Sequence, residues 1–272
     1  MPKFGRKVVV QLGNRSYEDL RISFDIRKTL TGEPNTAEIT IYNLGWVTVG
    51  DLALDFRNLR VRLLAGYETP SLLFEGNITH DGFTIEETGS DRILRVSAQT
   101  GIRAYQSARV RASFEAGTTY RQLFKDIVRQ MGFPTSVIPD TSGMGKKLQT
   151  GMCFSGEGAL YLDRLSASLG LDWSIQDGSE VQFVPKGQTL PERGPRYSPE
   201  LGNLVGSPRP TDIGADVTVL LDPIRPGQRY QVDKVSDSRL NGQFRADAVQ
   251  FVGDSGFDNS FYTIIEGRRL RT

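Results

Sequence analysis

The feature of this sequence that most restricts its fold is the alternation of apolar and polar residues in its first hundred positions. Ile22, Phe24 and Ile26 alternate with charged or polar neighbours, and several later segments share this period. A period of two places one set of side chains on a buried face and the other in solvent, as in an antiparallel strand. The strands expected from the pattern are 8–12, 21–27, 37–41, 59–65, 72–79, 83–87 and 93–98.

Turn-forming residues separate these predicted strands. Two examples are the segments 31–35 and 80–82, which contain Gly, Pro, Asn or Asp, and His80 is therefore expected in a turn. No long helix is predicted between the strands. Many short strands with turn signals favour a sandwich or a small barrel for residues 1–100.

The period changes from two to 3.6 after residue 115. An apolar stripe at helical spacing predicts a helix from 120 to 131, with Thr118 as its N-cap. A second helix is expected from about 156 to 169, with Ser155 as its cap and Gly170 at its end. The stripe of the first helix is expected to pack against a hairpin that follows the second; it consists of Tyr120, Leu123, Phe124, Ile127, Val128 and Met131.

That hairpin is predicted by the dipeptide Asp177-Gly178, which lies between two apolar runs carrying Trp173 and Phe183. Asp-Gly between alternating runs is among the strongest short-range hairpin signals. The middle block, defined here as residues 101–187, is therefore expected to be α+β.

The last part of the chain begins with a Pro- and Gly-rich arm, residues 188–214, and continues with strands. The arm is expected to lie along the β structure or a neighbouring subunit, because it has too few apolar residues to fold alone. The dipeptide Asn241-Gly242 predicts a hairpin. The strands expected here are 217–221, 230–235, 244–252 and 261–266.

These segments define a fold class that is mainly β with a smaller α+β part. We expect two small antiparallel β-barrel domains flanking the middle block. The expected division is 1–100 for the first barrel, 101–187 for the middle block, 188–214 for the linker or arm, and 215–272 for the second barrel.

Composition weighs against several classes of function. The chain has one His, His80, and one Cys, Cys153, so multi-His metal sites, Cys clusters and an internal disulfide framework are not expected. The formal net charge of +1 gives no general attraction to a polyanion. We expect no metal, no cofactor and no membrane association, since no apolar run approaches the length of a membrane span. Cys153 is expected to be a small buried hydrophobe.

One sequence motif points to catalysis. Residues 253–256, Gly-Asp-Ser-Gly, look like the nucleophile segment of trypsin-like serine proteases, which makes Ser255 a candidate nucleophile and His80 its candidate base. Phe257 stands where that family carries a further Gly. A polar loop at the end of a strand explains the segment better, and no catalytic residue is expected.

Other motifs are incomplete. The segment 156–161 resembles a dinucleotide loop but has Tyr161 in place of the third Gly, and 143–147 lacks the first Gly of a phosphate loop. Glu86 and Glu87 are adjacent on a predicted strand, so their side chains point to opposite faces and cannot share a substrate. A single-strand-binding surface would need basic residues interleaved with aromatics, for which the candidates are Arg103, Arg109, Arg111, Arg268, Arg269 and Arg271.

The order of segments resembles the baseplate hub proteins of contractile-tailed bacteriophages, which are related to the trimeric upper part of type VI secretion spike proteins. The resemblance spans nearly the whole chain and is weakest over 133–150 and 188–214. It rests on the combination of the segments 22–26, 35–44, 74–78, 117–120, 161–165, 170–173, 183–187, 220–227, 241–244 and 253–254.

This resemblance implies a structural role without catalytic, cofactor-binding or metal-binding residues. A homotrimer with two tube-like barrels per chain would form a pseudo-sixfold ring between the hexameric tail tube and the trimeric central spike. The implied partners are the tail tube protein or a tube initiator, the spike protein, other baseplate proteins, and DNA that passes without sequence-specific binding. The implied location is the virion tail baseplate, assembled in the host cytoplasm, and the channel should carry more Asp and Glu than Lys and Arg.

Three alternatives remain open at this level. Another tube-like tail component, such as a distal or tube-initiator protein, would need only one barrel. A serine hydrolase would use Ser255. A nucleic-acid-binding module would show affinity that falls steeply with salt.

Overall fold

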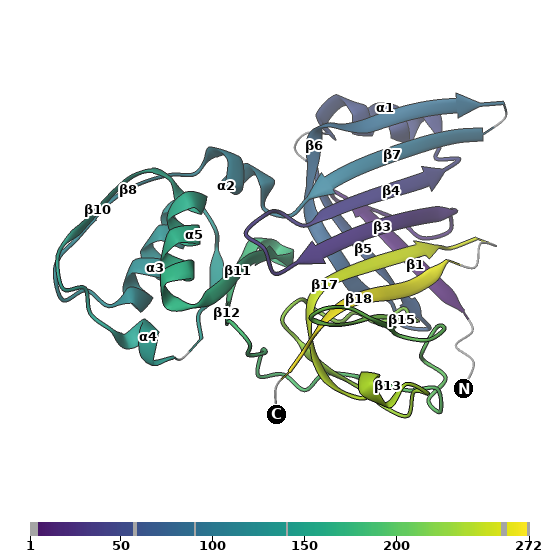
Figure 1. The fold of residues 1–272 in the computed structure, drawn as a ribbon. Helices are drawn as coiled ribbons and strands as arrows, with labels where there is room; N and C mark the ends of the chain where they lie inside the picture. The colour runs from purple at the N-terminus through teal and green to yellow at the C-terminus, as the bar shows by residue number, and fades with distance from the viewer. Residues whose placement is uncertain (1–4, 57–58, 90, 140, 257–259, 271–272) are drawn as a thin grey trace.

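The computed structural model describes residues 5–56, 59–89, 91–139, 141–256 and 260–270. The chain forms one large sheet with the middle block attached at one end (Figure 1). The strands of the large sheet are β1 (Arg6–Leu12), β2 (Arg15–Tyr17), β3 (Ile22–Thr29), β4 (Thr36–Tyr42), β5 (Arg60–Tyr67), β6 (Ser71–Thr88), β7 (Asp91–Gln99), β13 (Arg196–Tyr197), β14 (Arg209–Pro210), β15 (Gly214–Leu220), β16 (Arg229–Val232), β17 (Gly242–Asp254) and β18 (Phe261–Arg269).

The pairing of β17 with β3 joins the two ends of the chain. Along the main path the strand order is β14-β15-β18-β17-β3-β4-β7-β6-β5-β1-β2, and β16 with β13 branches from β17. Phe251 of β17 lies opposite Ile26 of β3 in an antiparallel register. Among the described residues no sheet closes on itself. The mainly β prediction is confirmed, whereas the two outer parts of the chain form one open sheet instead of two closed barrels.

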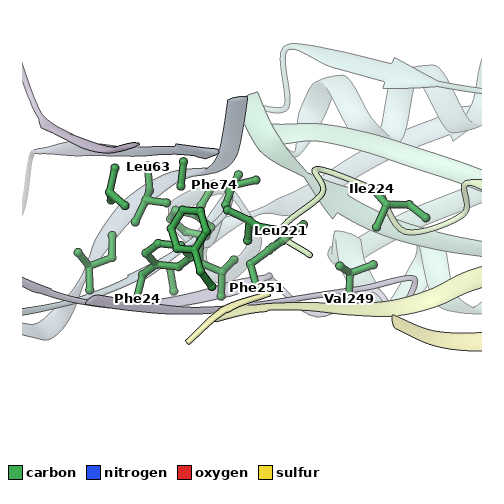
Figure 2. Packing of buried hydrophobic residues seen from close by; sticks show 14 of the residues in the cluster. Phe24, Leu63, Phe74, Leu221, Ile224, Val249 and Phe251 are labelled. Atoms are coloured by element: carbon green, nitrogen blue, oxygen red, sulfur yellow. The ribbon is translucent and has the colours of Figure 1, made fainter. Parts of the chain in front are cut away.

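The interior of this sheet is a single core to which both outer parts contribute. Phe24, Leu63 and Phe74 come from the N-terminal strands, and Leu221 and Phe251 come from the C-terminal part. Figure 2 shows these side chains packed together, with Ile224 and Val249 farther along the same interior. Burial of this shared apolar surface stabilises the two outer parts together.

The prediction of two strands separated by a turn at 80–82 is wrong. Residues 71–88 form one long strand, β6, whose pairing with β7 shifts at a bulge between Ile78 and Phe83. A Cβ on Gly82 would lie 2.2 Å from the carbonyl oxygen of Ser97, so this glycine allows the two backbones to approach. The turn-forming residues therefore make a bulge within the strand, and His80 lies on it.

Helix α1 (Trp46–Asp55) was not predicted. It begins after Gly45, which provides no side-chain cap, and it buries Val49 and Leu52 in the core. Trp46, Val47 and Leu54 are exposed. The helical period is hidden in the sequence because apolar residues occupy both faces of this helix.

The middle block combines two longer helices, α3 and α5, and two short ones, α2 and α4, with short sheets. Its elements are α2 (Ile102–Ser107), β8 (Arg109–Phe114), α3 (Tyr120–Gln130), β9 (Thr135–Val137), α4 (Ser142–Gly145), β10 (Met152–Glu157), α5 (Gly158–Leu169), β11 (Leu171–Gln176), the 3-10 turn η2 (Asp177–Ser179) and β12 (Glu180–Pro185). β10 pairs with β8, and β11 and β12 form the predicted hairpin, with β9 parallel to β12.

Helix α3 packs as its apolar stripe predicts. Phe124 is fully buried and meets Phe183 of the hairpin edge to face, with ring centroids 4.8 Å apart. The N-cap is Thr119, whose Oγ1 accepts from the backbone N–H of Gln122, and not Thr118. The predicted packing of the helix on the hairpin is confirmed.

The start of α5 differs from its prediction, whereas its end agrees. Ser155 does not cap the helix, because it belongs to β10 and its N–H donates to the hydroxyl of Tyr161. The helix begins at Gly158 and ends at Gly170, which has a left-handed φ of 66°. Glycine is favoured there because side chains disfavour that conformation.

The arm, residues 188–214, lies along the C-terminal strands. Tyr197 in β13 is buried beside β16, and the N–H of Val205 donates to the carbonyl of Thr218 on β15. The predicted Asn241-Gly242 hairpin is replaced by a longer loop, 233–241, which contains the 3-10 turn η3 (Ser238–Leu240). Asn241 closes this loop by accepting from the N–H of Val235, and Gly242 begins β17.

Candidate interaction surface

The large sheet has a polar face that both outer parts of the chain share. It extends over the adjacent strands β15, β18, β17, β3, β4, β7 and β6, which form the front layer in Figure 1. Side chains alternate across this layer: Ile26 and Ile39 point into the core, and Asp25 and Glu38 are exposed on the opposite face. We call this surface the polar sheet face.

Asp25 and Glu38 lie directly opposite each other on β3 and β4. Like charges in this position destabilise a sheet, so the pair is unfavourable for folding alone. Their hydrogen-bond partners are neutral: Asp25 accepts from the side-chain amide of Gln250 at 2.8 Å, and Glu38 accepts from the hydroxyl of Ser97 at 2.6 Å. Two negative charges thus remain at the centre of the polar sheet face.

The arginines around this centre are matched by carboxylates. Arg27 pairs with Glu266 at 3.1 Å, and Arg95 pairs with Glu86 at 3.2 Å. Toward the edges, Arg209 pairs with Asp216 and Arg268 with Asp247. Since these pairs cancel locally, Asp25 and Glu38 give the centre its negative sign.

The middle block is held against the end of the sheet by polar side chains. The carboxylate of Asp177 accepts from the ammonium group of Lys28 on β3 and from the backbone N–H of Glu75 on β6. The side-chain amide of Asn35 donates to the carbonyl of Ile175 at 2.8 Å. Burial lowers the pKa of Lys28, and the charge of Asp177 opposes this shift.

Close packing also holds the middle block against the end of the large sheet. A Cβ on Gly32 would lie 2.4 Å from the indole ring of Trp173, so the sheet loop packs flat on the hairpin. Arg245 of β17, which is almost fully buried, pairs with Asp172 at 3.0 Å on the other side of the joint. The middle block therefore has one defined orientation on the sheet.

The candidate nucleophile Ser255 is engaged in a structural role. Its hydroxyl donates to the carbonyl of Leu20 at 3.1 Å and accepts from the N–H of Ile22 at 2.9 Å. His80 contacts Asp81 and lies on β6, which is separated from β3 by β4 and β7. The structure does not bring the two candidates together, and Phe257 lies outside the described residues.

Cys153 is exposed on β10, so its predicted burial is wrong; its sulfur lies 3.3 Å from the hydroxyl of Ser113. It belongs to the solvent face of a two-stranded sheet whose other face packs on the helices. Within the described ranges, no group of three or more His, Cys, Asp or Glu residues could hold a metal ion. None of the helices described combines the length and apolar character that a membrane crossing requires.

The candidate basic residues do not form one surface. Arg109 and Arg111 are exposed on β8, at the far end of the middle block, whereas Arg268 and Arg269 end β18 in the large sheet (Figure 1). Arg271 and the side chain of Arg103 lie outside the described residues. The segments 156–161 and 143–147 lie at the start of α5 and around α4, where they serve as chain connections.

The family model described as Baseplate hub gp41 matches residues 6–267. The chain belongs to this baseplate hub family. The resemblance identified from the sequence is therefore confirmed, and the polar sheet face is a surface of a phage tail component. No curated protein matches the hub chain in sequence.

Solved structures share the fold of this chain over almost its full length. A tail protein from Neisseria meningitidis MC58 is 10% identical, with a TM-score of 0.71, and the match covers 98% of this chain and 97% of that one. The 43 kDa tail protein of prophage MuSo2 from Shewanella oneidensis is 11% identical, with a TM-score of 0.69 and coverage of 97% and 98%.

A third similar structure comes from a secretion system. The E. coli c3393 protein is described as a component of the type VI secretion system with structural similarity to T4 bacteriophage tail proteins gp27 and gp5. It is 11% identical, with a TM-score of 0.64, and the match covers 96% of this chain and 77% of that one. At sequence identities this low, the structural matches show a common fold.

The sequence did not single out Asp25 and Glu38 as functional residues. Both occupy solvent positions of predicted strands, where carboxylates are ordinary. Only the register of β3 on β4 makes them neighbours. The alternation pattern could place each residue on the outer face but gave no means of aligning the two strands.

Proposed function

We propose that this chain is the structural hub of a phage contractile-tail baseplate, acting as a homotrimer. Three copies would form a pseudo-sixfold ring that joins the hexameric tail tube to the trimeric central spike. Membership of the hub family supports this role, as does the contribution of two β regions from each chain to one sheet. Each β region would stand for one tube-like unit of the ring, although the two regions share one open sheet and do not form the two separate barrels expected from the sequence.

The polar sheet face would line the channel of this ring. The observation that carries the assignment is the Asp25–Glu38 pair, which is unfavourable for folding and lies at the centre of a face shared by both β regions. A surface along which DNA slides should repel phosphates instead of holding them. The ion-paired arginines around the centre offer little attraction, because each has a carboxylate within 3.1 to 3.2 Å.

The width of the face agrees with such a channel. Seven neighbouring strands at about 4.8 Å spacing take up roughly 34 Å of a closed ring, and three copies give a perimeter of about 100 Å and a backbone diameter of about 32 Å. A ring of this size leaves space along its axis after side chains are added. The proposed partners are the tail tube protein or tube initiator, the spike protein and other baseplate proteins. DNA would pass through the channel without sequence-specific binding.

Electron cryomicroscopy of the assembled baseplate tests this proposal. Three copies around the axis, with Asp25 and Glu38 facing the lumen, are expected. Six copies, or a polar sheet face covered by another protein, would contradict it.

A charge-reversed phage tests the channel separately. Replacing both Asp25 and Glu38 with Lys should leave particle assembly unchanged and slow genome delivery, in a manner that added salt relieves. The matched control is a double Lys substitution at the exposed carboxylates Glu68 and Glu115, which lie in the turn between β5 and β6 and in the middle block, outside the polar sheet face. Equal delivery by the two variant phages would contradict the channel assignment.

A further inference from the structure

Helix α1 presents an apolar face to solvent. Val47 is 80% exposed and Leu54 is 87% exposed, and Trp46 at the start of the helix is 56% exposed. Val47, Gly50 and Leu54 follow one another at spacings of three and four residues, so they lie on one side of the helix. A Cβ on Gly50 would meet nothing within 4 Å, and the centre of this face is therefore flat and open.

The helix lies beside a strand edge that none of the described strands pairs with. Residues 83–88 of β6 pair with β7, but the pairing of β6 with β5 ends at Asn77. Because hydrogen-bonding directions alternate along a strand, Ile85 and its alternate neighbours direct their backbone groups away from β7. Ile85 is also an exposed apolar side chain, and Phe83 stacks on Phe56 at the end of α1. We call α1 and this edge of β6 together the helix-edge face.

A second group of exposed apolar side chains lies on the arm. Leu201, Val205 and Ile213 are 53%, 41% and 52% exposed. The arm follows the outer edge of β15, because Val205 donates to Thr218 and Leu220 donates to Asn203. This surface, the arm face, ends the front layer on the side opposite α1 (Figure 1).

We infer that the helix-edge face of one copy binds the arm face of a second copy. The inference rests on the proposed hub function and names the surfaces that would hold the ring together. Two different apolar patches at opposite ends of the front layer make a head-to-tail contact, which closes into a ring when the rotation between copies is right. Seven of the nine large hydrophobic side chains exposed among the described residues belong to these two faces.

The dimensions of the two faces agree with a second copy as the occupant. The ten residues of α1 are about 15 Å long, and the seven residues of β15 beneath the arm extend about 24 Å. The helix therefore fits along the arm without overhanging it. Pro208 and Pro210 of the arm have no backbone N–H to donate to a strand of the second copy. Side-chain packing, more than strand pairing, would therefore make this contact.

Disulfide trapping on the full chain tests the inference. Cys153 is first replaced by Ser, since it is an exposed thiol. The double variant Val47→Cys with Val205→Cys should then give a covalent trimer on mild oxidation, seen on a non-reducing gel. Each single variant should stay monomeric on the same gel, because a head-to-tail contact never places a residue beside its own copy.

Matched controls separate this contact from chance collision. Leu160→Cys on α5, an exposed position outside both faces, should not cross-link when combined with Val205→Cys. Leu54→Asp should weaken trimer association at least tenfold in sedimentation, whereas Leu160→Asp should not change it. Unchanged melting temperatures would show that both Asp variants are folded.

Three results would overturn the inference. If the wild type is a trimer and the double-cysteine variant does not cross-link, the hub function stands and the assignment of faces is wrong. If Val47→Cys alone gives a covalent dimer, the helix-edge face binds its own copy through a twofold contact. A double variant that stays monomeric at every concentration also overturns the inference, because faces that bind each other should cross-link when crowded.

Discussion

Lys28 on β3 and Asp177 at the hairpin tip form the ion pair that joins the large sheet to the middle block. The side chain of Lys28 is 4% exposed and that of Asp177 is 22% exposed. Asp177 also accepts from the backbone N–H of Glu75. The orientation of the middle block on the large sheet therefore depends on a buried ammonium group whose carboxylate partner, among the described residues, is Asp177.

Asp177→Ala should destabilise the chain by about 3–5 kcal/mol, because it leaves the ammonium group of Lys28 buried without its counter-charge. Lys28→Met should lower the free energy of unfolding by less, since Met fills a similar volume and Asp177 still accepts a hydrogen bond from the backbone N–H of Glu75. Denaturant unfolding of the two single variants and the double variant measures the coupling. Equal losses for the two single changes would contradict this account.

Phe124→Ala should lower the free energy of unfolding by about 3–5 kcal/mol, because it leaves a cavity against Phe183 in a fully buried site. The control is Leu160→Ala on the neighbouring helix, whose side chain is exposed and should cost about 0.5 kcal/mol or less. Urea denaturation compares the two. A loss below about 1 kcal/mol for the Phe124 variant would mean that the core relaxes around the site.

Tyr197 and Tyr230 should make the chain sensitive to alkaline pH. Burial raises the pKa of both phenols, so they stay protonated in the folded chain when tyrosines in the unfolded chain ionise near pH 10. Each should contribute full stability below pH 10 and lose about 1.4 kcal/mol per pH unit above it. Thermal unfolding between pH 8 and 11 measures this slope.

The corresponding Phe variants provide the control for that slope. Among the described residues, neither Tyr197 nor Tyr230 has a hydrogen-bond partner for its buried hydroxyl. Removing the hydroxyls should therefore cost little at neutral pH, about 1 kcal/mol or less. The double Phe variant should show a shallower alkaline slope. An unchanged slope would show that other groups cause the pH dependence.

Gly→Ala substitutions should have opposite effects at two positions. A Cβ on Gly194 would lie 1.2 Å from the carbonyl oxygen of Arg229, so Gly194→Ala should cost about 1–3 kcal/mol by forcing the arm away from β16. Gly50→Ala in the exposed middle of α1 should stabilise the chain by about 0.5–1 kcal/mol. Differential scanning calorimetry would detect both changes in melting temperature. Melting temperatures that move in the same direction for the two variants would contradict the prediction.

Ser255→Ala should destabilise the chain by about 1–2 kcal/mol, because it removes the hydroxyl that connects Leu20 to Ile22. We expect no turnover of peptide, glycan or nucleotide substrates by the wild type. Peptide and ester hydrolysis assays on both proteins check this. Rapid cleavage by the wild type that the substitution abolishes would support the hydrolase alternative instead.

Local features of the fold could be predicted from the sequence. The alternation around Phe24 predicts a strand with one buried face, and the stripe containing Phe124 predicts a helix packed on a hairpin. Gly170 predicts the end of a helix, and Asp177-Gly178 predicts the turn of that hairpin. These features depend on residues close together in the chain, whose side-chain period and backbone freedom the sequence determines directly.

Long-range features were decided only by the tertiary structure. The pairing of Phe251 with Ile26 joins the two ends of the chain into one sheet, and the register of β3 on β4 places Asp25 opposite Glu38. Helix α1 forms because its inner residues find a core to cover, although its outer residues are also apolar. The sequence determined most of the strands, the helix carrying Phe124 and the turn at Asp177-Gly178, but not α1 or the bulge at 80–82. Partner strands, register and close backbone approach depend on contacts between residues far apart in the chain, and no local pattern encodes them.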